Sequence, residues 1–152
     1  MSESRLRHCL TPGLSILVGT VDPQGFPAPC RGVAIASNDD LQTVTVFVPV
    51  ATSQETIRNV ALTRRLAVAA SHPVDHCTTQ LKGLVTEARL AREDEAPVVR
   101  RALEGFAEIL EGVGVPRRLT QMAAHWPAFA ITMRVDDVFD QTPGPQAGAR
   151  LR

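Results

Sequence analysis

The sequence predicts a mainly β domain of the α+β class, in which about six antiparallel strands close into a small barrel and helices pack against it. Three observations support this prediction. Much of the chain alternates apolar and polar residues, as half-buried strands do, and turn residues separate the alternating segments. One helical segment follows the third strand, and a pair of helical segments precedes the last strand. A sheet of this size is expected to close because open edges would pair with other chains.

Turn residues mark where the strands end. The run PQGFP at 23–27 follows the first strand, NDD at 38–40 follows the second, and HPVD at 72–75 precedes the fifth. Short connections of this kind predict that the first three strands form an antiparallel meander. Gly83 predicts a bend or a bulge in the fifth strand. The predicted strands cover residues 14–22, 28–36, 41–48, 66–71, 78–91 and 129–139.

The helical segments are predicted from capping residues and apolar spacing. Thr52 and Glu55 fit a capping box, which predicts a helix over 52–62. Acidic residues and a proline in the first turn begin a second helix over 94–112, and a shorter helix follows over 116–124. The second helix carries an apolar stripe that suits burial against the barrel. The stripe comprises Val99, Ala102, Leu103, Phe106, Ile109 and Leu110.

The length of the chain sets the domain organisation. A chain of 152 residues is long enough for one core and too short for two. We expect residues 1–141 to form a single domain. Residues 142–152 form a tail rich in proline and glycine, which is expected to lack regular structure.

Composition argues against several classes of partner. Sixteen Lys and Arg balance sixteen Asp and Glu, so the protein is not expected to bind nucleic acid through bulk positive charge. Apolar runs are shorter than a membrane span, and the N-terminal segment lacks the apolar stretch of a signal peptide. We therefore expect a cytoplasmic protein without a membrane partner. Cys9, Cys30 and Cys77 lie far apart without a CxxC motif and are expected to be reduced thiols.

Common catalytic and metal motifs are absent from the sequence. There is no G-x-S-x-G nucleophile elbow, no G-x-G-x-x-G dinucleotide fingerprint and no phosphate-binding P-loop. His72 and His76 are four residues apart, but a proline-containing turn gives them no common face. The sequence therefore predicts no metal site.

The segment TTQLKG at 78–83 contains Lys82, the only lysine in the chain. On a strand, Thr78, Gln80 and Lys82 share one face. Gln80 offers a donor and an acceptor and Lys82 a positive charge, so the pair suits the edge of a heterocycle and an anion. The alternative is an exposed strand face whose polar residues prevent aggregation. The spacing alone leaves both interpretations open.

Three segments together resemble the pyridoxamine 5'-phosphate oxidase-like family, the FMN-binding split barrels. These are CRGVAIA, ATSQETIRNVALTRRLAVAAS and HPVDHCTTQLKG, and the resemblance extends from about Leu14 to Phe139. It implies a six-stranded antiparallel split β-barrel with flanking helices. It also implies a homodimer with two flavin sites at the subunit interface.

The resemblance implies which residues hold the flavin. Arg31 falls on the arginine that contacts the phosphate, and Ser53 on the serine that begins the next helix. Gln80 falls on the glutamine that contacts the flavin, and Lys82 on the second arginine of that strand. With the neighbouring hydroxyl of Thr52, these five residues form the expected cofactor site.

The sequence departs from the family pattern at three cations. Ala36, Gln54 and Glu55 stand where the family has Lys, Arg and Lys. A phosphate carries nearly two negative charges, so these changes weaken its attraction to the site. Arg31, two hydroxyls and the N-terminus of a helix remain to bind it.

The resemblance implies an FMN-dependent oxidoreductase that acts on a small molecule, with the flavin carrying out the redox chemistry. One alternative is a non-catalytic binding protein for haem, deazaflavin or another planar ligand, in which His72, His76 or His125 ligates iron. A further alternative is a dimer that binds no cofactor.

Overall fold

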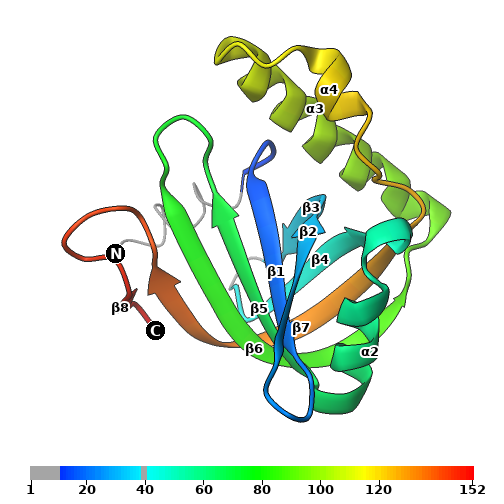
Figure 1. Cartoon of the computed structure of the whole chain (residues 1–152), viewed down its shortest axis with the longest axis vertical. Helices are drawn as coiled ribbons and strands as arrows, with labels where there is room; N and C mark the ends of the chain where they lie inside the picture. The colour runs from blue at the N-terminus through cyan, green and yellow to red at the C-terminus, as the bar shows by residue number, and fades with distance from the viewer. Residues whose placement is uncertain (1–10, 39–40) are drawn as a thin grey trace.

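A single antiparallel sheet dominates the computed structural model, which describes residues 11–38 and 41–152. Its strands are β1 (Ser15–Val21), β2 (Pro27–Gly32), β3 (Ala34–Ser37), β4 (Thr43–Pro49), β5 (Arg65–Ser71), β6 (Thr78–Leu90), β7 (Ala128–Asp140) and β8 (Ala149–Arg150). The order is β2-β1-β5-β6-β7-β4-β3, and β8 pairs with β7. Because β2 and β3 are consecutive in the chain but lie at opposite ends of this order, the sheet curls into a split barrel (Figure 1). The predicted fold class is confirmed.

The second predicted strand, over 28–36, is divided at Val33. Its first half, β2, pairs with β1, and its second half, β3, pairs with β4. The predicted meander of three whole strands is therefore wrong, because the middle segment divides its pairing between two neighbours. Gly32 allows the close approach at the division, since a Cβ atom there would lie 2.5 Å from Cγ2 of Ile16.

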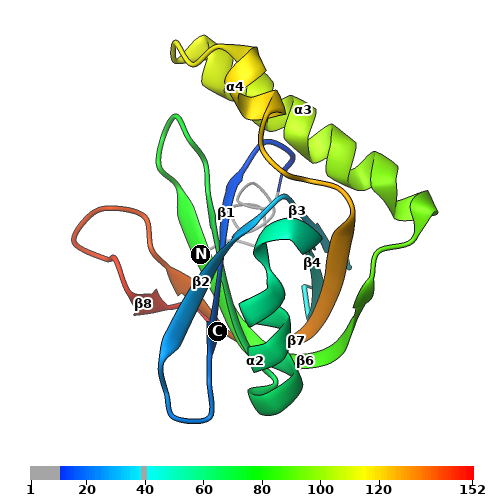
Figure 2. The ribbon, with the colours of Figure 1, turned by 45° about the vertical axis from the view of Figure 1, so that its right-hand side comes forward.

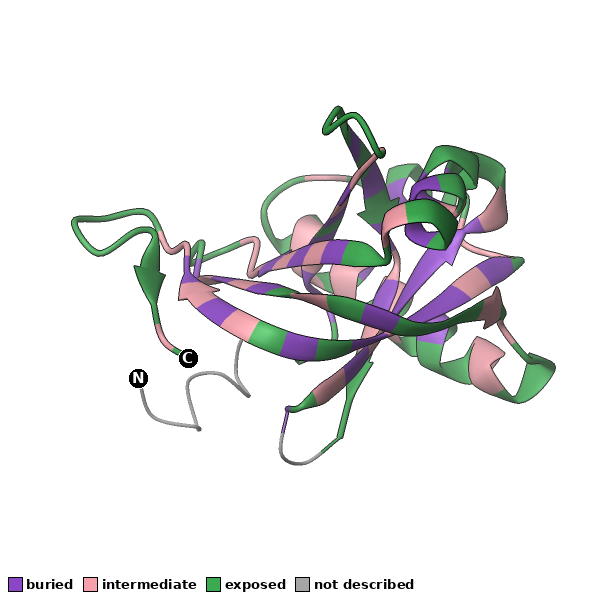
Figure 3. Cartoon of the chain, turned by 90° about the horizontal axis from the view of Figure 1, so that it is seen from below, coloured by how far each residue is buried: buried purple, intermediate pink, exposed green. Residues whose placement is uncertain are grey.

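The interior of the barrel is filled by the inward side of every long strand. Burial alternates along the strands, as Figure 3 shows by colour. On β7 the buried residues Ile131, Met133 and Val135 alternate with the more exposed Thr132 and Arg134, as predicted. The most deeply buried apolar residues of this core include Val18, Val46, Val48, Val68, Leu81, Ile131 and Met133.

The first helical region covers β1 and β2 on one side of the barrel. A short 3-10 turn, η1 (Val50–Thr52), precedes the helix α2 (Gln54–Thr63). The predicted capping box is wrong, because Ser53 rather than Thr52 is the N-cap and it makes no capping hydrogen bond. The side chain of Asn59 donates to Oγ1 of Thr20 over 3.2 Å, which ties the helix to β1.

The other helices lie together at one end of the barrel, away from α2 (Figures 1 and 2). They are η2 (Glu93–Glu95), α3 (Ala96–Gly112) and α4 (Arg117–Gln121), and α4 ends three residues before the predicted Ala124. Val99 of α3 is buried in a second apolar cluster with Phe47 of β4. The cluster also contains Ala34, Ala128 and Ala130.

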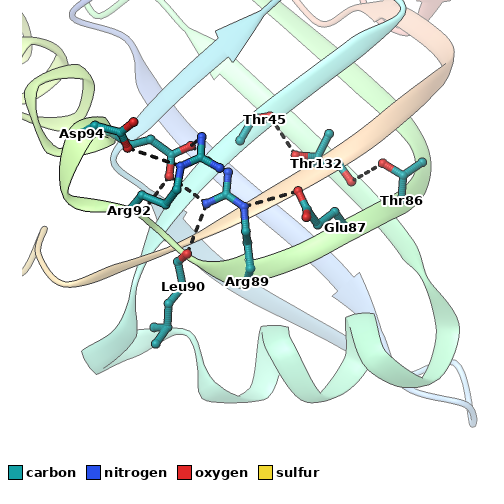
Figure 4. A network of polar contacts seen from close by, with 9 residues as sticks. Thr45, Thr86, Glu87, Arg89, Leu90, Arg92, Asp94 and Thr132 are labelled. Atoms are coloured by element: carbon teal, nitrogen blue, oxygen red, sulfur yellow. Dashed lines mark hydrogen bonds and ion pairs between the residues drawn. The ribbon is translucent and has the colours of Figure 1, made fainter.

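A polar network fixes the start of α3 (Figure 4). The Glu95 carboxylate accepts hydrogen bonds from the Arg89 guanidinium at 2.7 and 2.8 Å and from the Arg92 backbone N–H at 2.7 Å. These bonds, with that to Arg89 contributing most, lower the pKa of Glu95 from its usual 4.5 to about 2. The network joins the end of β6 to the helical pair.

Gly83 produces the irregularity predicted in the long strand β6. The register between β6 and β7 shifts between Lys82 and Gly83. A Cβ atom on Gly83 would lie 1.9 Å from the carbonyl oxygen of Arg134, so only glycine fits there. The predicted bulge is confirmed.

The C-terminal tail ends in regular structure, contrary to the prediction. β8 pairs with β7, and Arg150 forms an ion pair with Asp137. The Leu151 N–H donates to the Val138 carbonyl over 2.7 Å, and the Arg152 guanidinium donates to the Leu41 carbonyl over 2.9 Å. These bonds hold the last residues on the barrel of their own chain.

Some predictions concern residues outside the described ranges. Cys9, the N-terminal segment over 1–10 and part of the predicted turn at 38–40 fall there. Cys30 and Cys77 are both buried. No helix among the described residues is long and apolar enough to cross a membrane.

Candidate functional site

The predicted site residues line two separate cavities. The first, called here the Arg31 cavity, has a volume of about 420 Å³ and lies between the barrel and the α3 and α4 helices. The second, called here the Lys82 groove, has a volume of about 700 Å³ and crosses β1, β5, β6 and β7. Arg31 and Thr52 line the first, and Gln80 and Lys82 line the second. One protomer therefore does not bring all of the predicted residues together.

Arg31 lies on the outward face of β2. Its neighbours Cys30 and Gly32 are buried, so the alternation of the strand directs Arg31 away from the core. Its guanidinium carbon lies 5.1 Å from the centre of the Phe106 ring, a cation–π contact with α3. Within the described residues the guanidinium has no ion pair or hydrogen bond. No described residue therefore neutralises the positive charge at the edge of the Arg31 cavity.

Ser53 does not reach either cavity. Its side chain is fully buried, and its hydroxyl donates to the carbonyl of Pro49 over 2.6 Å. A phosphate contact from Ser53 would require this bond to break. The exposed Thr52 is therefore the hydroxyl best placed beside Arg31.

Lys82 lies on the outer face of the barrel, as the strand pattern predicts. Thr79 and Leu81 are buried on the inner face, whereas Gln80 and Lys82 face outward. The Lys82 ammonium lies 4.8 Å from the centre of the Phe139 ring on β7. Lys82 has no ion pair within the described part of the chain.

The surroundings of Lys82 explain why no described carboxylate pairs with it. Asp137 lies opposite Lys82 in the strand register, but Arg150 of the tail forms an ion pair with Asp137. Gln80 accepts a hydrogen bond from the Gln141 side chain over 3.3 Å and keeps its own amide donors. The Lys82 groove thus offers one ammonium and one amide beside an aromatic ring.

The strand register relates the two cavities. Arg31 pairs with Leu17, Leu17 with Ala69, and Ala69 with Gln80, so these residues form one row across four strands. Three strand spacings separate Arg31 from Gln80 along the sheet, roughly 14 Å. The two residues share the outer face but cannot contact the same small group.

The histidines considered as iron ligands line neither cavity. Nδ1 of His72 is 3.2 Å from Asp75, and Nδ1 of His125 is 3.0 Å from the Ala123 carbonyl. His76 is exposed in the turn before β6. In the described part of the chain, no three His, Cys, Asp or Glu side chains are grouped so that they could hold a metal ion. None of these three histidines thus supplies a haem ligand in either cavity.

The structure adds three residues that the sequence analysis did not assign to the site. Phe106 and Phe139 each lie under a cation, and Thr120 lines the Arg31 cavity. Phe106 was predicted only as part of the apolar stripe, and nothing in the sequence distinguishes Thr120 from other helix threonines. Both cation–π contacts join residues distant in sequence, so no local pattern could reveal them.

Comparison with protein-family models and with curated proteins finds no match. Among solved structures, HupZ of Group A Streptococcus is similar with a TM-score of 0.57 and 18% identity, over 97% of this chain and 100% of that one. An F420 reductase has a TM-score of 0.56 and 14% identity, over 87% and 94%. A candidate pyridoxamine 5'-phosphate oxidase from Lactobacillus delbrueckii has a TM-score of 0.56 and 12% identity, over 91% and 93%. The chain thus has the split-barrel fold of the pyridoxamine 5'-phosphate oxidase-like proteins.

Proposed function

We propose that the protein is an FMN-dependent oxidoreductase that acts as a homodimer on a small organic molecule. The flavin lies between the Arg31 cavity of one protomer and the Lys82 groove of its partner. One observation carries this proposal: Arg31 and Lys82 both lack an anionic partner within the described residues, and each lies over an aromatic ring at the edge of a cavity. A cation held in this way is available to a ligand anion.

The residues of the Arg31 cavity suit the anionic tail of the flavin. The guanidinium of Arg31 donates charge-assisted hydrogen bonds, and the Thr52 hydroxyl adds a donor. Glu55, in the first turn of α2, opposes an anion at that helix end. We therefore expect the tail to be bound mainly by Arg31, with modest affinity.

The residues of the Lys82 groove suit the polar edge of the ring. Gln80 supplies amide donors, and the Lys82 ammonium favours negative charge close to it. The flavin, when bound, supplies the transfer of a hydride or of electrons. Lys82 would favour that transfer by placing its positive charge beside the ring, where it would stabilise added negative charge.

The outer face of the barrel suits the second protomer. Small residues, Gly19, Ala67 and Ala69, occupy the middle of this face, and Leu17 and Leu84 remain 54% and 41% exposed. A two-fold contact would bury these leucines and bring one protomer's Lys82 groove toward the other's Arg31 cavity. Such a contact joins the two halves of the site that one protomer leaves apart.

The test is a titration of the purified protein with FMN, followed by quenching of flavin fluorescence, with sedimentation in parallel. We expect saturable binding with one flavin per protomer and a dimer at micromolar concentration. Arg31→Met is expected to weaken binding about tenfold or more, because it removes a charge-assisted bond. Arg118→Met is the control, since this exposed arginine of α4 lines neither cavity.

Other outcomes would contradict the proposal. A colourless monomer that takes up no FMN would contradict both the proposed cofactor and the proposed dimer interface. A Soret band in the purified protein would indicate haem. Detection of a released deazaflavin by mass spectrometry would identify that cofactor instead of FMN.

A further inference from the structure

One residue that lines the Arg31 cavity carries a buried hydroxyl that no described residue satisfies. Thr120 of α4 is 6% exposed and lines the cavity. Its Oγ1 atom has no hydrogen-bond partner within the described residues. Burying a hydroxyl without a partner destabilises a fold, so the described part of the chain gives this group no structural role.

The wall around Thr120 is otherwise apolar. We call it the α3–α4 wall, and it is formed by Leu103, Phe106, Leu110, Val115, Leu119, Thr120, Ala123 and Ala124. Thr120 is the only residue of this wall with a hydrogen-bonding side chain. A wall of this composition favours an apolar ligand and offers it one hydrogen bond. In small-molecule sites the apolar contacts usually provide the affinity, and the few polar groups fix the orientation of the ligand.

The charge of the ligand follows from the position of Arg31. This cation is exposed, so its attraction for a carboxylate is screened by water. Placing a carboxylate against the leucines of the wall would also remove it from water at high cost. Where the flavin tail occupies Arg31, that charge is not available to a second ligand. A neutral molecule therefore suits the wall better than an anion.

We propose that the α3–α4 wall binds the substrate, a neutral and mostly apolar molecule with one hydrogen-bond-accepting oxygen, such as an aromatic or branched aldehyde or ketone. Rotation about the Cα–Cβ bond of Thr120 turns its buried hydroxyl toward the cavity, where it donates a hydrogen bond to that oxygen. That this ligand is the substrate rests on the proposed function, which places the flavin tail beside Arg31 in the same cavity. The volume of about 420 Å³ is at the lower end of the range for small-molecule sites and suits a one- or two-ring compound.

The test uses three probes with the same rings and the full-length protein without added flavin. They are naphthalene, 1-naphthaldehyde and 1-naphthoate, and binding is followed through the methyl NMR signals of Leu103, Leu110 and Val115. We expect 1-naphthaldehyde to bind about fivefold more tightly than naphthalene, the factor that one neutral hydrogen bond contributes. In Arg31→Met, which lacks the cation that would attract an anion to this cavity, we expect 1-naphthoate to bind more weakly than the aldehyde.

Thr120→Val is the decisive variant, because it keeps the shape of the side chain and removes the hydroxyl. It is expected to abolish the preference for the aldehyde over naphthalene while leaving the affinity for naphthalene unchanged. Ala124→Leu places a larger side chain in the cavity and is expected to weaken both ligands equally. Thr132→Val is the matched control, since Thr132 bonds to Thr45 on another part of the barrel and lines neither cavity.

Two results would overturn the inference. Equal affinities of the wild type for aldehyde and naphthalene, or a preference that survives in Thr120→Val, would exclude the hydrogen bond. Tighter binding of 1-naphthoate than of the aldehyde by Arg31→Met would exclude a neutral ligand. Because no flavin is present, these results do not depend on the FMN titration, and a protein that binds the aldehyde but no FMN would refute only the proposed redox function.

Discussion

The beginning of α3 and the Arg31 cavity lie at two places along the same helical pair, and they treat polar groups in opposite ways. At the beginning of α3, Arg89 and Arg92 surround Glu95, and the carboxylate receives several short hydrogen bonds. At the cavity, the Arg31 guanidinium and the Thr120 hydroxyl have no partner of this kind within the described residues. Satisfied groups hold the helices on the barrel, whereas the unsatisfied groups belong to residues that line a cavity. This difference separates residues needed for folding from residues needed for binding.

The largest effect on stability is expected from Glu95→Gln. The substitution keeps the shape of the side chain but removes the charge that Arg89 and Arg92 contact, which should lower the free energy of unfolding by about 2 kcal/mol. Urea denaturation measures this loss. Glu93→Gln in the same turn is the control, because the exposed Glu93 has no ion pair among the described residues, and its effect should stay within about 0.5 kcal/mol. Equal losses of unfolding free energy in the two variants would show that the charge of Glu95 is not the source of the stabilisation.

The same network predicts how stability depends on pH. The pKa of Glu95 is lowered from 4.5 to about 2 in the folded protein. Because the folded value is the lower one, the stabilisation is complete above about pH 4.5 and is lost as the pH falls toward 2. The difference in unfolding free energy between wild type and Glu95→Gln should therefore shrink over this interval. A difference that stays constant from pH 6 to pH 3 would show that the charge of Glu95 is not its cause.

Thr120→Val should change stability in the opposite direction. Replacing an unsatisfied buried hydroxyl with a methyl group of similar size should raise the free energy of unfolding by about 1 kcal/mol. Thermal denaturation of the ligand-free variant measures this gain. A clear loss of stability would mean that Thr120 has a structural partner and would remove the contrast with Glu95.

The alternation of residues predicted most of the barrel, because burial on one face requires it. The apolar positions of β7, the outward direction of Lys82 and the bulge at Gly83 follow from spacing and from the properties of glycine. The division of the second strand at Val33 could not be predicted in this way, because both of its halves alternate normally. It depends on which neighbour each half meets after the sheet has curled.

The candidate site was predicted less completely than the fold. Ser53 fits the family pattern, but the Pro49 carbonyl four residues earlier takes its hydroxyl, and a motif does not reveal such local competition. Arg31 and Gln80 were predicted as one site, yet three strand spacings along the curled sheet separate them. The unsatisfied state of Thr120 depends on how α4 packs, which the sequence pattern does not determine.

The smallest effect on stability is expected from Lys82→Met, the counterpart of the Glu95 change at an unsatisfied cation. The contact between the Lys82 ammonium and the Phe139 ring is exposed, so losing it should lower the free energy of unfolding by no more than about 1 kcal/mol. The bound flavin should nevertheless become harder to reduce, because the variant lacks the positive charge that stabilises the reduced anion. Reduction against a dye of known potential measures the change. An unchanged potential would mean that Lys82 only protects the strand face, which was the other interpretation of the TTQLKG segment. A lower potential together with unchanged folding would show that this charge acts on the ligand and not on the barrel.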